Sequence, residues 1–265
     1  MPQDEQRRPR NPLAEIAAYY RDLGVAELHL DRATAPVLSA KKAAAPALAE
    51  RSRAVEVVTA PDRPERLSVG GPALPTLAEL AHEVAGCQTC RLCSTRNRTV
   101  FSDGDPNARL MFIGEAPGAD EDASGIPFVG RAGQLLTKMI EQGMGLRRAD
   151  VYIANVLKCR PPENRPPMPD EVASCRRFLE AQIALVQPEV IVGLGKFSCQ
   201  FLLDSDEGMT AMRGRWGLYG KIAVMPTYHP SYLLRQPERK KDCWEDLLNV
   251  LVKLGLPAPA AQRKA

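Results

Sequence analysis

Cysteine thiols are the residues of this chain whose spacing most clearly indicates chemistry. Cys87 and Cys90 form a CxxC pair, and Cys159 and Cys175 follow further along the chain. Thiolates at these spacings suit zinc or a [4Fe–4S] cluster, so the spacing leaves both ligands open. Cys93 adds a further candidate, because Cys87, Cys90 and Cys93 also have a ferredoxin-like spacing. The pattern predicts a metal or cluster site.

Polar residues gather in three segments that each follow an apolar stretch. The first, 114–122, has the sequence GEAPGADED, and the others are 155–165 and 227–235. Acids and glycines directly after an apolar strand are typical of a reactive pocket. Ligands of parallel α/β sheets bind beyond the carboxyl ends of the strands, so we expect the three segments to line one pocket.

The elements that position these segments alternate between strands and helices. The apolar pattern predicts strands at 109–113, 151–157, 190–194 and 222–225. It predicts a first helix that is capped by Thr76, with Glu79 in a capping box, and ends at Gly86. Further helices are predicted at 131–144, 169–186, 196–203 and 237–254. Such alternation predicts parallel βαβ units in a three-layer α/β/α sandwich around a central, mostly parallel, four-stranded sheet.

Composition and charge narrow the class of protein. The chain has 265 residues and a formal net charge of +3, so its bulk charge does not indicate a nucleic-acid binder. The N-terminus has no apolar core of a signal peptide, and no run approaches the roughly 18 apolar residues that span a bilayer. Seven cysteines without an export signal favour reduced thiols. We therefore expect a soluble, cytoplasmic protein that contacts no membrane.

The chain is predicted to contain one folded domain with two extensions. Residues 1–75 form an N-terminal extension, with a short amphipathic helix at 13–30 followed by an Ala/Pro-rich linker. Residues 76–257 form the catalytic domain, and 258–265 a disordered tail. The extension is either dispensable or a binding segment for an unknown protein partner.

Three motifs carry a family resemblance. Residues 114–136 contain GEAPG and GIPFVGRAGQLL, residues 155–164 are NVLKCRPPEN, and residues 228–235 are YHPSYLLR. In this order, and with the cysteine spacing, they resemble the family 4 (iron–sulfur) uracil-DNA glycosylases from about Cys87 to Leu254. The resemblance implies the uracil-DNA glycosylase fold and hydrolysis of the N-glycosidic bond of a flipped uracil, which leaves an abasic site for base excision repair.

The resemblance also implies a cofactor and partners. Cys87, Cys90, Cys159 and Cys175 fall where the family places the ligands of a structural [4Fe–4S] cluster, and Cys93 does not. The partner implied is uracil-containing single- or double-stranded DNA, bound by a monomer associated with the nucleoid. No lysine suited to a Schiff base is evident among the pocket positions, so a monofunctional enzyme is expected.

The chemistry of base excision assigns roles to residues of the motifs. Phe128 is expected to stack on the flipped uracil, and the Asn155 amide to pair with its O4 and N3–H. His229, as a neutral donor, would bind the departing O2. Glu115 would orient water or balance the oxocarbenium charge, while Ala116 stands where the better-known uracil glycosylases carry a water-activating aspartate.

Other residues are expected to shape the pocket and hold DNA. Glu121 is predicted to form a wall near uracil C5 that excludes the thymine methyl group, and Asn164 to contact the sugar or phosphate. Leu233 and Leu234 are candidates for an apolar wedge in the gap left by the flipped base, although at least one of them is expected to be buried at the start of a helix. The remaining predicted DNA contacts are Lys158, Arg160, Arg213, Arg215, Ser231 and Arg235.

Two other classes of function compete with the enzyme. One is a non-catalytic Fe–S module of the same fold that binds DNA or senses damage, and the other is an Fe–S electron carrier. Asn155, Phe128 and His229 together favour the enzyme, because a carrier needs no base-shaped pocket. A related family forms a covalent histidine adduct through an inserted basic segment. Here Phe128 leads directly into 130–133 without an insert, so turnover is predicted.

Overall fold

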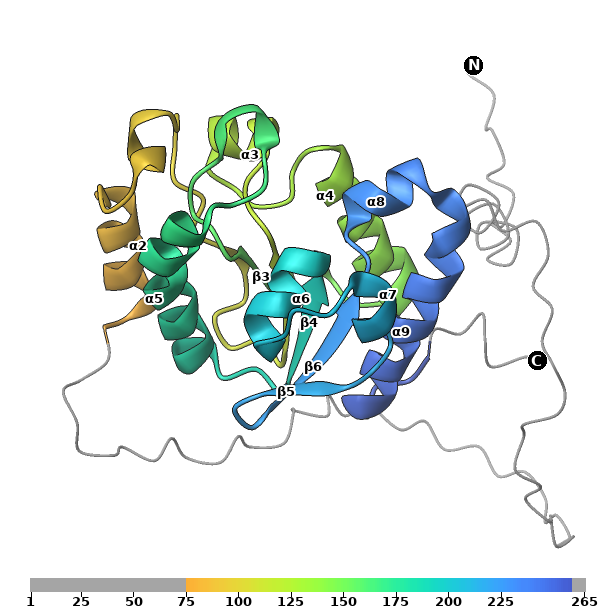
Figure 1. Ribbon diagram of the computed structural model, residues 1–265. Coiled ribbons are helices and arrows are strands. Elements are labelled where there is room, and N and C mark those ends of the chain that lie inside the picture. Colours follow the sequence, from red (N-terminus) through yellow and green to blue (C-terminus); the bar gives the residue numbers. More distant parts are fainter. Residues whose placement is uncertain (1–74, 259–265) are drawn as a thin grey trace, which may run out of the picture. The chain divides into compact units, whose positions relative to one another are not determined.

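The computed structural model describes residues 75–258 (Figure 1). The predicted helix at 13–30, the linker that follows it and the predicted C-terminal tail beyond residue 258 lie outside the described residues. Within the described part of the chain, no helix is long and apolar enough to cross a membrane.

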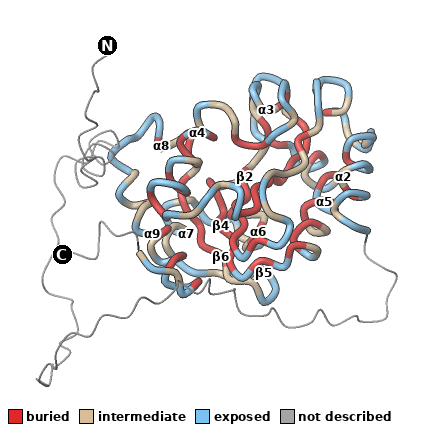
Figure 2. Tube along the Cα trace, turned by 180° about the vertical axis from the view of Figure 1, so that it is seen from behind, coloured by how far each residue is buried: buried red, intermediate tan, exposed pale blue. Residues whose placement is uncertain are grey.

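A six-stranded sheet with the order β1-β3-β2-β4-β6-β5 forms the centre. Its four inner strands are parallel: β3 (Tyr152–Asn155), β2 (Leu110–Gly114), β4 (Val190–Leu194) and β6 (Ile222–Thr227). All residues of β2, β3 and β4 are buried, because helices cover both faces of the sheet (Figure 2). The predicted parallel four-stranded centre is confirmed.

Two short antiparallel strands extend the sheet at its edges. β1 (Asp103–Gly104) pairs with β3, and β5 (Gly217–Tyr219) pairs with β6. Neither strand is predicted from the sequence, because two or three residues are too few to show an alternating pattern.

Alternate residues of each strand enter two different cores. Phe112 and Val192 pack with α4 (Arg131–Lys138) and α9 (Lys240–Lys253). Met111 and Ile191 pack on the opposite face with two other helices. Those helices are α5 (Pro169–Val186) and α6 (Lys196–Leu203). The result is the predicted three-layer sandwich.

A third core lies beside this sandwich and contains thiols. Helix α2 (Leu77–Ala85) packs against α5, as Figure 1 shows, and between them are Leu80, Cys159 and Cys175. The predicted capping box is present: the Glu79 backbone N–H donates to Thr76 Oγ1 at 3.2 Å, and the Thr76 backbone N–H donates to Glu79 Oε2 at 2.7 Å.

Element boundaries differ from prediction mainly near the site. α4 continues as a π-helical turn, Met139–Met144, and the last predicted helix begins as a 3₁₀ turn, Pro237–Arg239. The strand predicted at 151–157 ends at Asn155. Three short helices lie within segments predicted as loops: α3 (Ala119–Ser124), α7 (Met209–Met212) and α8 (Pro230–Arg235). Each has six residues or fewer, so no helical periodicity announces it.

Candidate active site and thiol cavity

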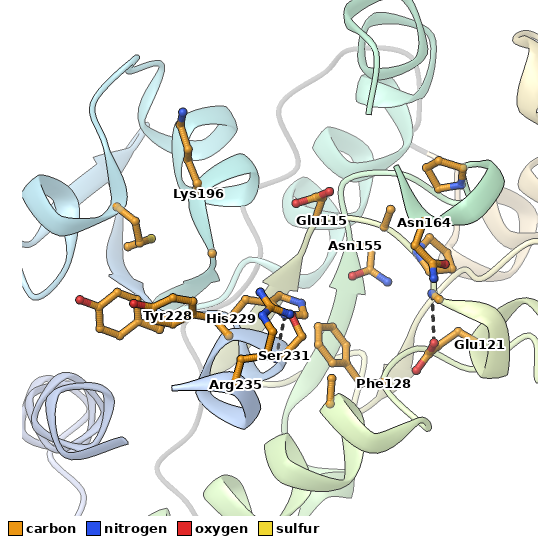
Figure 3. A pocket seen from close by; sticks show the side chains of 18 of the residues that line it. Glu115, Glu121, Phe128, Asn155, Asn164, Lys196, Tyr228, His229, Ser231 and Arg235 are labelled. Carbon is orange, nitrogen blue, oxygen red and sulfur yellow. Dashed lines mark hydrogen bonds between the residues drawn. The ribbon is translucent and has the colours of Figure 1, made fainter. Parts of the chain in front are cut away.

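A cavity of about 700 Å³ opens beyond the carboxyl ends of the parallel strands (Figure 3). It is lined by residues from all three polar segments of the sequence. Of the predicted site residues, the lining contains Glu115, Ala116, Glu121, Phe128, Asn155, Asn164, His229, Ser231 and Arg235. The tertiary structure therefore brings together side chains that are more than one hundred positions apart in the chain.

Asn155 presents an unpaired amide oxygen in this cavity. The residue ends β3 next to Gly114 of β2 and is only 2% exposed. Among the described residues, its Oδ1 has no hydrogen-bond partner. A buried polar atom without a partner costs about 1–3 kcal/mol, so this oxygen marks the place of a donor on a ligand.

Phe128 lies close to that amide because Gly114 has no side chain. A Cβ atom added to Gly114 would lie 2.4 Å from Asn155 Oδ1 and 2.5 Å from the Phe128 ring. Figure 3 shows the two side chains next to each other. A planar ligand that stacks on the ring can therefore also reach the amide.

The backbone of Phe128 is in an unusual conformation. Its φ is 54°, in the left-handed region, which is rare for a bulky residue and costs about 1–3 kcal/mol. The Val129 and Gly130 N–H groups both donate to Glu121 Oε1 at 2.9 Å. Gly133 is also required, because an added Cβ would lie 1.9 Å from the Phe128 carbonyl.

His229 faces the same cavity with a defined tautomer. Its Nδ1 accepts the Ser231 backbone N–H at 3.1 Å and lies 2.8 Å from Ser231 Oγ. Desolvation, helped by the Arg235 cation, lowers the pKa of His229 to about 4. The ring is therefore neutral near pH 7, and with Nδ1 accepting, its proton is on Nε2. The side chain offers one N–H donor to a ligand.

Glu115 supplies a carboxylate to the cavity wall. Burial raises the pKa of Glu115 above its usual range. Its backbone carbonyl accepts the Leu157 N–H at 3.0 Å, which fixes the loop after β2 against the chain after β3. The neighbouring Ala116 also lines the cavity and packs against the thiol-containing core.

Two predicted DNA contacts are wrong because their side chains are buried. Lys158 is 1% exposed, and its Nζ donates to the Asn155 carbonyl at 2.7 Å and to Gln182 Oε1 at 2.5 Å. Leu233 is 1% exposed and belongs to the core beside α4, so it cannot form a wedge. Leu234, by contrast, is 43% exposed.

The predicted arginines differ in what they contact. Arg213 is mostly buried and paired with Asp246 at 3.1 Å, so its prediction as a phosphate contact is also wrong. Arg215 is exposed and lies 3.3 Å from Glu207, but it does not line the cavity. Arg235 is exposed at the cavity.

Asn164 is held at the cavity by an arginine. Arg160 Nε donates to Asn164 Oδ1 at 2.8 Å. This bond fixes the orientation of an exposed amide on a backbone whose φ is 55°.

Several residues that line the cavity were not predicted as site residues. Gly195 and Lys196 follow β4, another of the parallel strands, so the rule that selected the ends of the other three would have selected them too. Met209 and Thr210 come from the unpredicted helix α7, which is too short to show a helical pattern in the sequence. The other missed lining residues are Pro117, Gly118, Ala132, Pro161, Arg165, Tyr228 and Tyr232.

The cysteines line a second cavity near the first. Its lining contains the four predicted ligands, Cys87, Cys90, Cys159 and Cys175, together with Cys93. Burial raises the pKa of Cys159 to about 11. Among residues 75–258, no three His, Cys, Asp or Glu side chains form a group that could hold a metal ion.

Two N–H groups point at sulfur atoms of this thiol cavity. Arg96 Nη1 donates to Cys159 Sγ at 3.2 Å, and the Lys158 backbone N–H donates to Cys175 Sγ at 3.3 Å. The thiols thus come with donors that would stabilise negative charge on sulfur.

Fold and cavity define an α/β protein with a pocket beyond the carboxyl ends of a parallel sheet. Residues 101–248 match the family model of the Uracil DNA glycosylase superfamily, and the chain belongs to this family. The resemblance found in the motifs is confirmed.

Curated relatives agree with the family model. The chain is 44% identical over 179 residues to the Type-4 uracil-DNA glycosylase of Saccharolobus solfataricus, covering 64% of this chain and 83% of that protein. It is 49% identical over 164 residues to the Type-4 uracil-DNA glycosylase of Thermotoga maritima, covering 60% and 84%. Similarity to the Type-5 uracil-DNA glycosylase of Thermus thermophilus is lower, 34% over 120 residues, covering 40% and 54%.

Proposed function

We propose that this protein is a uracil-DNA glycosylase that flips uracil out of DNA and hydrolyses its N-glycosidic bond, leaving free uracil and an abasic site. The observation that carries the proposal is the buried, unpaired Asn155 Oδ1 next to the Phe128 ring. Uracil has a donor at N3 and an acceptor at O4, and one side-chain amide matches both. The names of the type-4 relatives support the same activity.

Binding and orientation come first in the proposed mechanism. Phe128 stacks on the flipped base while Asn155 pairs with its edge. A base bound in this cavity would exchange water for protein contacts, which strengthens each electrostatic contact made with it.

Cleavage of the N-glycosidic bond then separates charge between the uracil and the sugar, and the site offers a group to stabilise each of the two charges. Negative charge develops on uracil O2, where the Nε2–H of the neutral His229 donates. Positive charge develops on the sugar, where the Glu115 carboxylate balances it or orients the attacking water. Ala116 offers no carboxylate, and the Glu121 carboxylate is already bound to backbone N–H groups. Glu115 is therefore the acid of the pocket to which we assign this role.

DNA would be held at the mouth of the cavity. Arg235 and Lys196 lie there as cations for phosphates, and the exposed Leu234 is the remaining candidate for a wedge. Because the pocket reads only a flipped base, the protein is expected to accept single- and double-stranded DNA.

Incubation with uracil-containing oligonucleotides, followed by alkali, tests the proposed activity. The parent should produce abasic sites, and Asn155→Asp should lower kcat/KM about a hundredfold, because a bidentate base contact is worth about 3 kcal/mol. Asn249→Asp makes the same chemical change on the exposed surface of α9 and should leave kcat/KM unchanged. A parent without activity, or an Asn155→Asp variant equal to the parent, would refute the proposal.

We also propose that Cys87, Cys90, Cys159 and Cys175 hold a [4Fe–4S] cluster. The proposal is supported by the four thiols' lining one cavity and by the N–H groups that two of them accept. When bound, the cluster supplies a cross-link between segment 87–90 and segment 159–175 rather than redox chemistry. Zinc is the alternative occupant.

Iron, sulfide and zinc analysis of the purified protein tests the cluster. We expect iron and sulfide in the parent and in Cys93→Ser, and their loss in Cys90→Ser. Zinc in place of iron would favour the alternative occupant. Loss of iron in Cys93→Ser but not in Cys90→Ser would show that Cys93, and not Cys90, is a ligand.

A further inference from the structure

We infer that Glu121 is a positioning residue that holds Phe128 in its stacking conformation, so that the base platform depends on a carboxylate behind it. This inference rests on the proposed function. It differs from the sequence-based expectation, in which Glu121 forms a wall against the thymine methyl group.

Both oxygens of the Glu121 carboxylate are already occupied. Oε1 accepts the N–H groups of Val129 and Gly130 at 2.9 Å, and Oε2 accepts the Gly118 N–H at 3.0 Å. One side chain thereby ties the GEAPG loop to the two peptide groups that directly follow Phe128. Figure 3 shows Glu121 with its bond to the loop drawn as a dashed line.

The conformation of Phe128 needs such support. A phenylalanine with φ 54° is strained, and strained backbone persists only where its surroundings fix it. Gly114 and Gly133 make room for the ring and the carbonyl of Phe128. These glycines have no side chain that could hold Phe128 in this conformation. Glu121 holds it there, because its charge-assisted bonds fix the peptide groups that must follow a left-handed residue at position 128.

The consequence for the site is specific. Without the carboxylate, the Val129 and Gly130 N–H groups lose their acceptor, and Phe128 can relax to an ordinary φ. The ring then leaves its place beside Asn155, so base stacking is lost while the rest of the fold remains.

Two other roles for Glu121 give different outcomes. A helix cap for α3 would affect stability alone, since Glu121 stands at the third position of that helix. A wall near C5 would affect the choice between uracil and thymine. Only a positioning role makes the effect of Glu121 depend on Phe128.

A double-mutant cycle tests this dependence. Glu121→Gln, Phe128→Leu and the double variant are compared with the parent by kcat, KM and inhibition by free uracil. We expect kcat/KM to fall about tenfold in Glu121→Gln, with weaker inhibition by uracil, and about ten- to hundredfold in Phe128→Leu. The double variant should match Phe128→Leu within about twofold, because the platform is already gone.

Controls separate the possible failures. Asp120→Asn removes an exposed carboxylate from the same helix and should leave kcat/KM unchanged. Thermal unfolding verifies the fold, and if Glu121→Gln does not fold, Glu121→Asp, which keeps the charge but shortens the reach, replaces it in the cycle with the same expectation.

Multiplicative effects in the double variant, or excision of thymine by Glu121→Gln, would overturn the inference while the parent still cleaves uracil. A parent inactive on uracil-containing DNA would overturn the proposed function and this inference together.

Discussion

At the scale of single residues, the proposed chemistry depends on a few side chains whose hydrogen-bonding groups are fixed by their protein neighbours. Asn155 keeps one amide oxygen unpaired, and His229 keeps one ring nitrogen as a donor because Ser231 occupies the other. Such preorganisation places donors and acceptors where charge develops, without reorganisation during the reaction.

The state of His229 gives a prediction about pH. The pKa of His229 is about 4 in the folded protein and 6.5 in the ordinary case. Between pH 4 and pH 6.5, His229 is therefore protonated in the unfolded chain but neutral in the folded protein. The contribution of His229 to stability is therefore complete above pH 6.5 and is lost as the pH falls toward 4. Denaturant unfolding should show the parent losing free energy of unfolding over this range relative to His229→Gln.

The same state is directly observable by NMR. The His229 imidazole should titrate near pH 4, and His82→Gln, on the exposed side of α2, should not change this titration. An imidazole that titrates near its ordinary value would contradict the neutral-donor role.

At the scale of elements, the short helix α3 joins the two cavities. Its Glu121 binds the pocket loops, while Asp122, which is 1% exposed, binds the segment that follows the cysteines. Asp122 accepts the backbone N–H of Asn97 at 3.0 Å, the Asn97 side-chain amide at 2.6 Å and the Arg98 N–H at 3.4 Å. Adjacent carboxylates on one helix thus anchor the pocket loop to the thiol segment.

Removing the second of these carboxylates should destabilise the protein. In Asp122→Ala, the N–H groups of Asn97 and Arg98 lose their acceptor, at a cost of about 3 kcal/mol in the free energy of unfolding. The neighbouring exposed Asp120→Ala should change it by less than about 0.5 kcal/mol. Urea unfolding of both variants measures the difference, and equal effects would show that the Asp122 bonds do not anchor the segment.

Lys158 provides a second link of the same kind. Its backbone N–H donates to Cys175 Sγ, and its Nζ donates to the carbonyl of Asn155. One buried residue therefore contacts both the thiol cavity and the residue proposed to read the base, which explains why its charge is not available to DNA.

At the scale of the whole molecule, the described residues that form the three cores and line both cavities lie within 77–256. The family match lies within the same range.

A truncated protein tests the predicted domain organisation. A chain that begins at residue 75 should keep its iron content and retain kcat/KM on uracil-containing oligonucleotides within about twofold of the full chain, since every residue to which a role is assigned remains. A large loss of activity in a variant that still folds would assign a catalytic or DNA-binding role to the N-terminal extension.

Much of this organisation was predictable because parallel βαβ folds follow strong local rules. Strand β4 and helices α5 and α6 have the predicted bounds, since long apolar or periodic stretches carry their own signal. The strand-end rule then selected three of the four strand-end segments that line the cavity.

The errors have a common physical cause. Lys158, Arg213 and Leu233 were assigned to DNA from residue type, but their exposure depends on which face of a loop or short helix meets the core. A charged residue can be buried where the tertiary structure supplies partners for it, and nothing in the local sequence announces those partners.

The sequence by itself determined the alternating α/β plan, the three motifs and the cysteine spacing, because these depend on residue types at short separations. Only the tertiary structure decided which side chains meet. It placed the unpaired Asn155 amide beside the strained Phe128, gave His229 its tautomer, and turned Glu121 from an expected wall into a support. These properties depend on burial and on hydrogen bonds between segments, which exist only after the chain has folded.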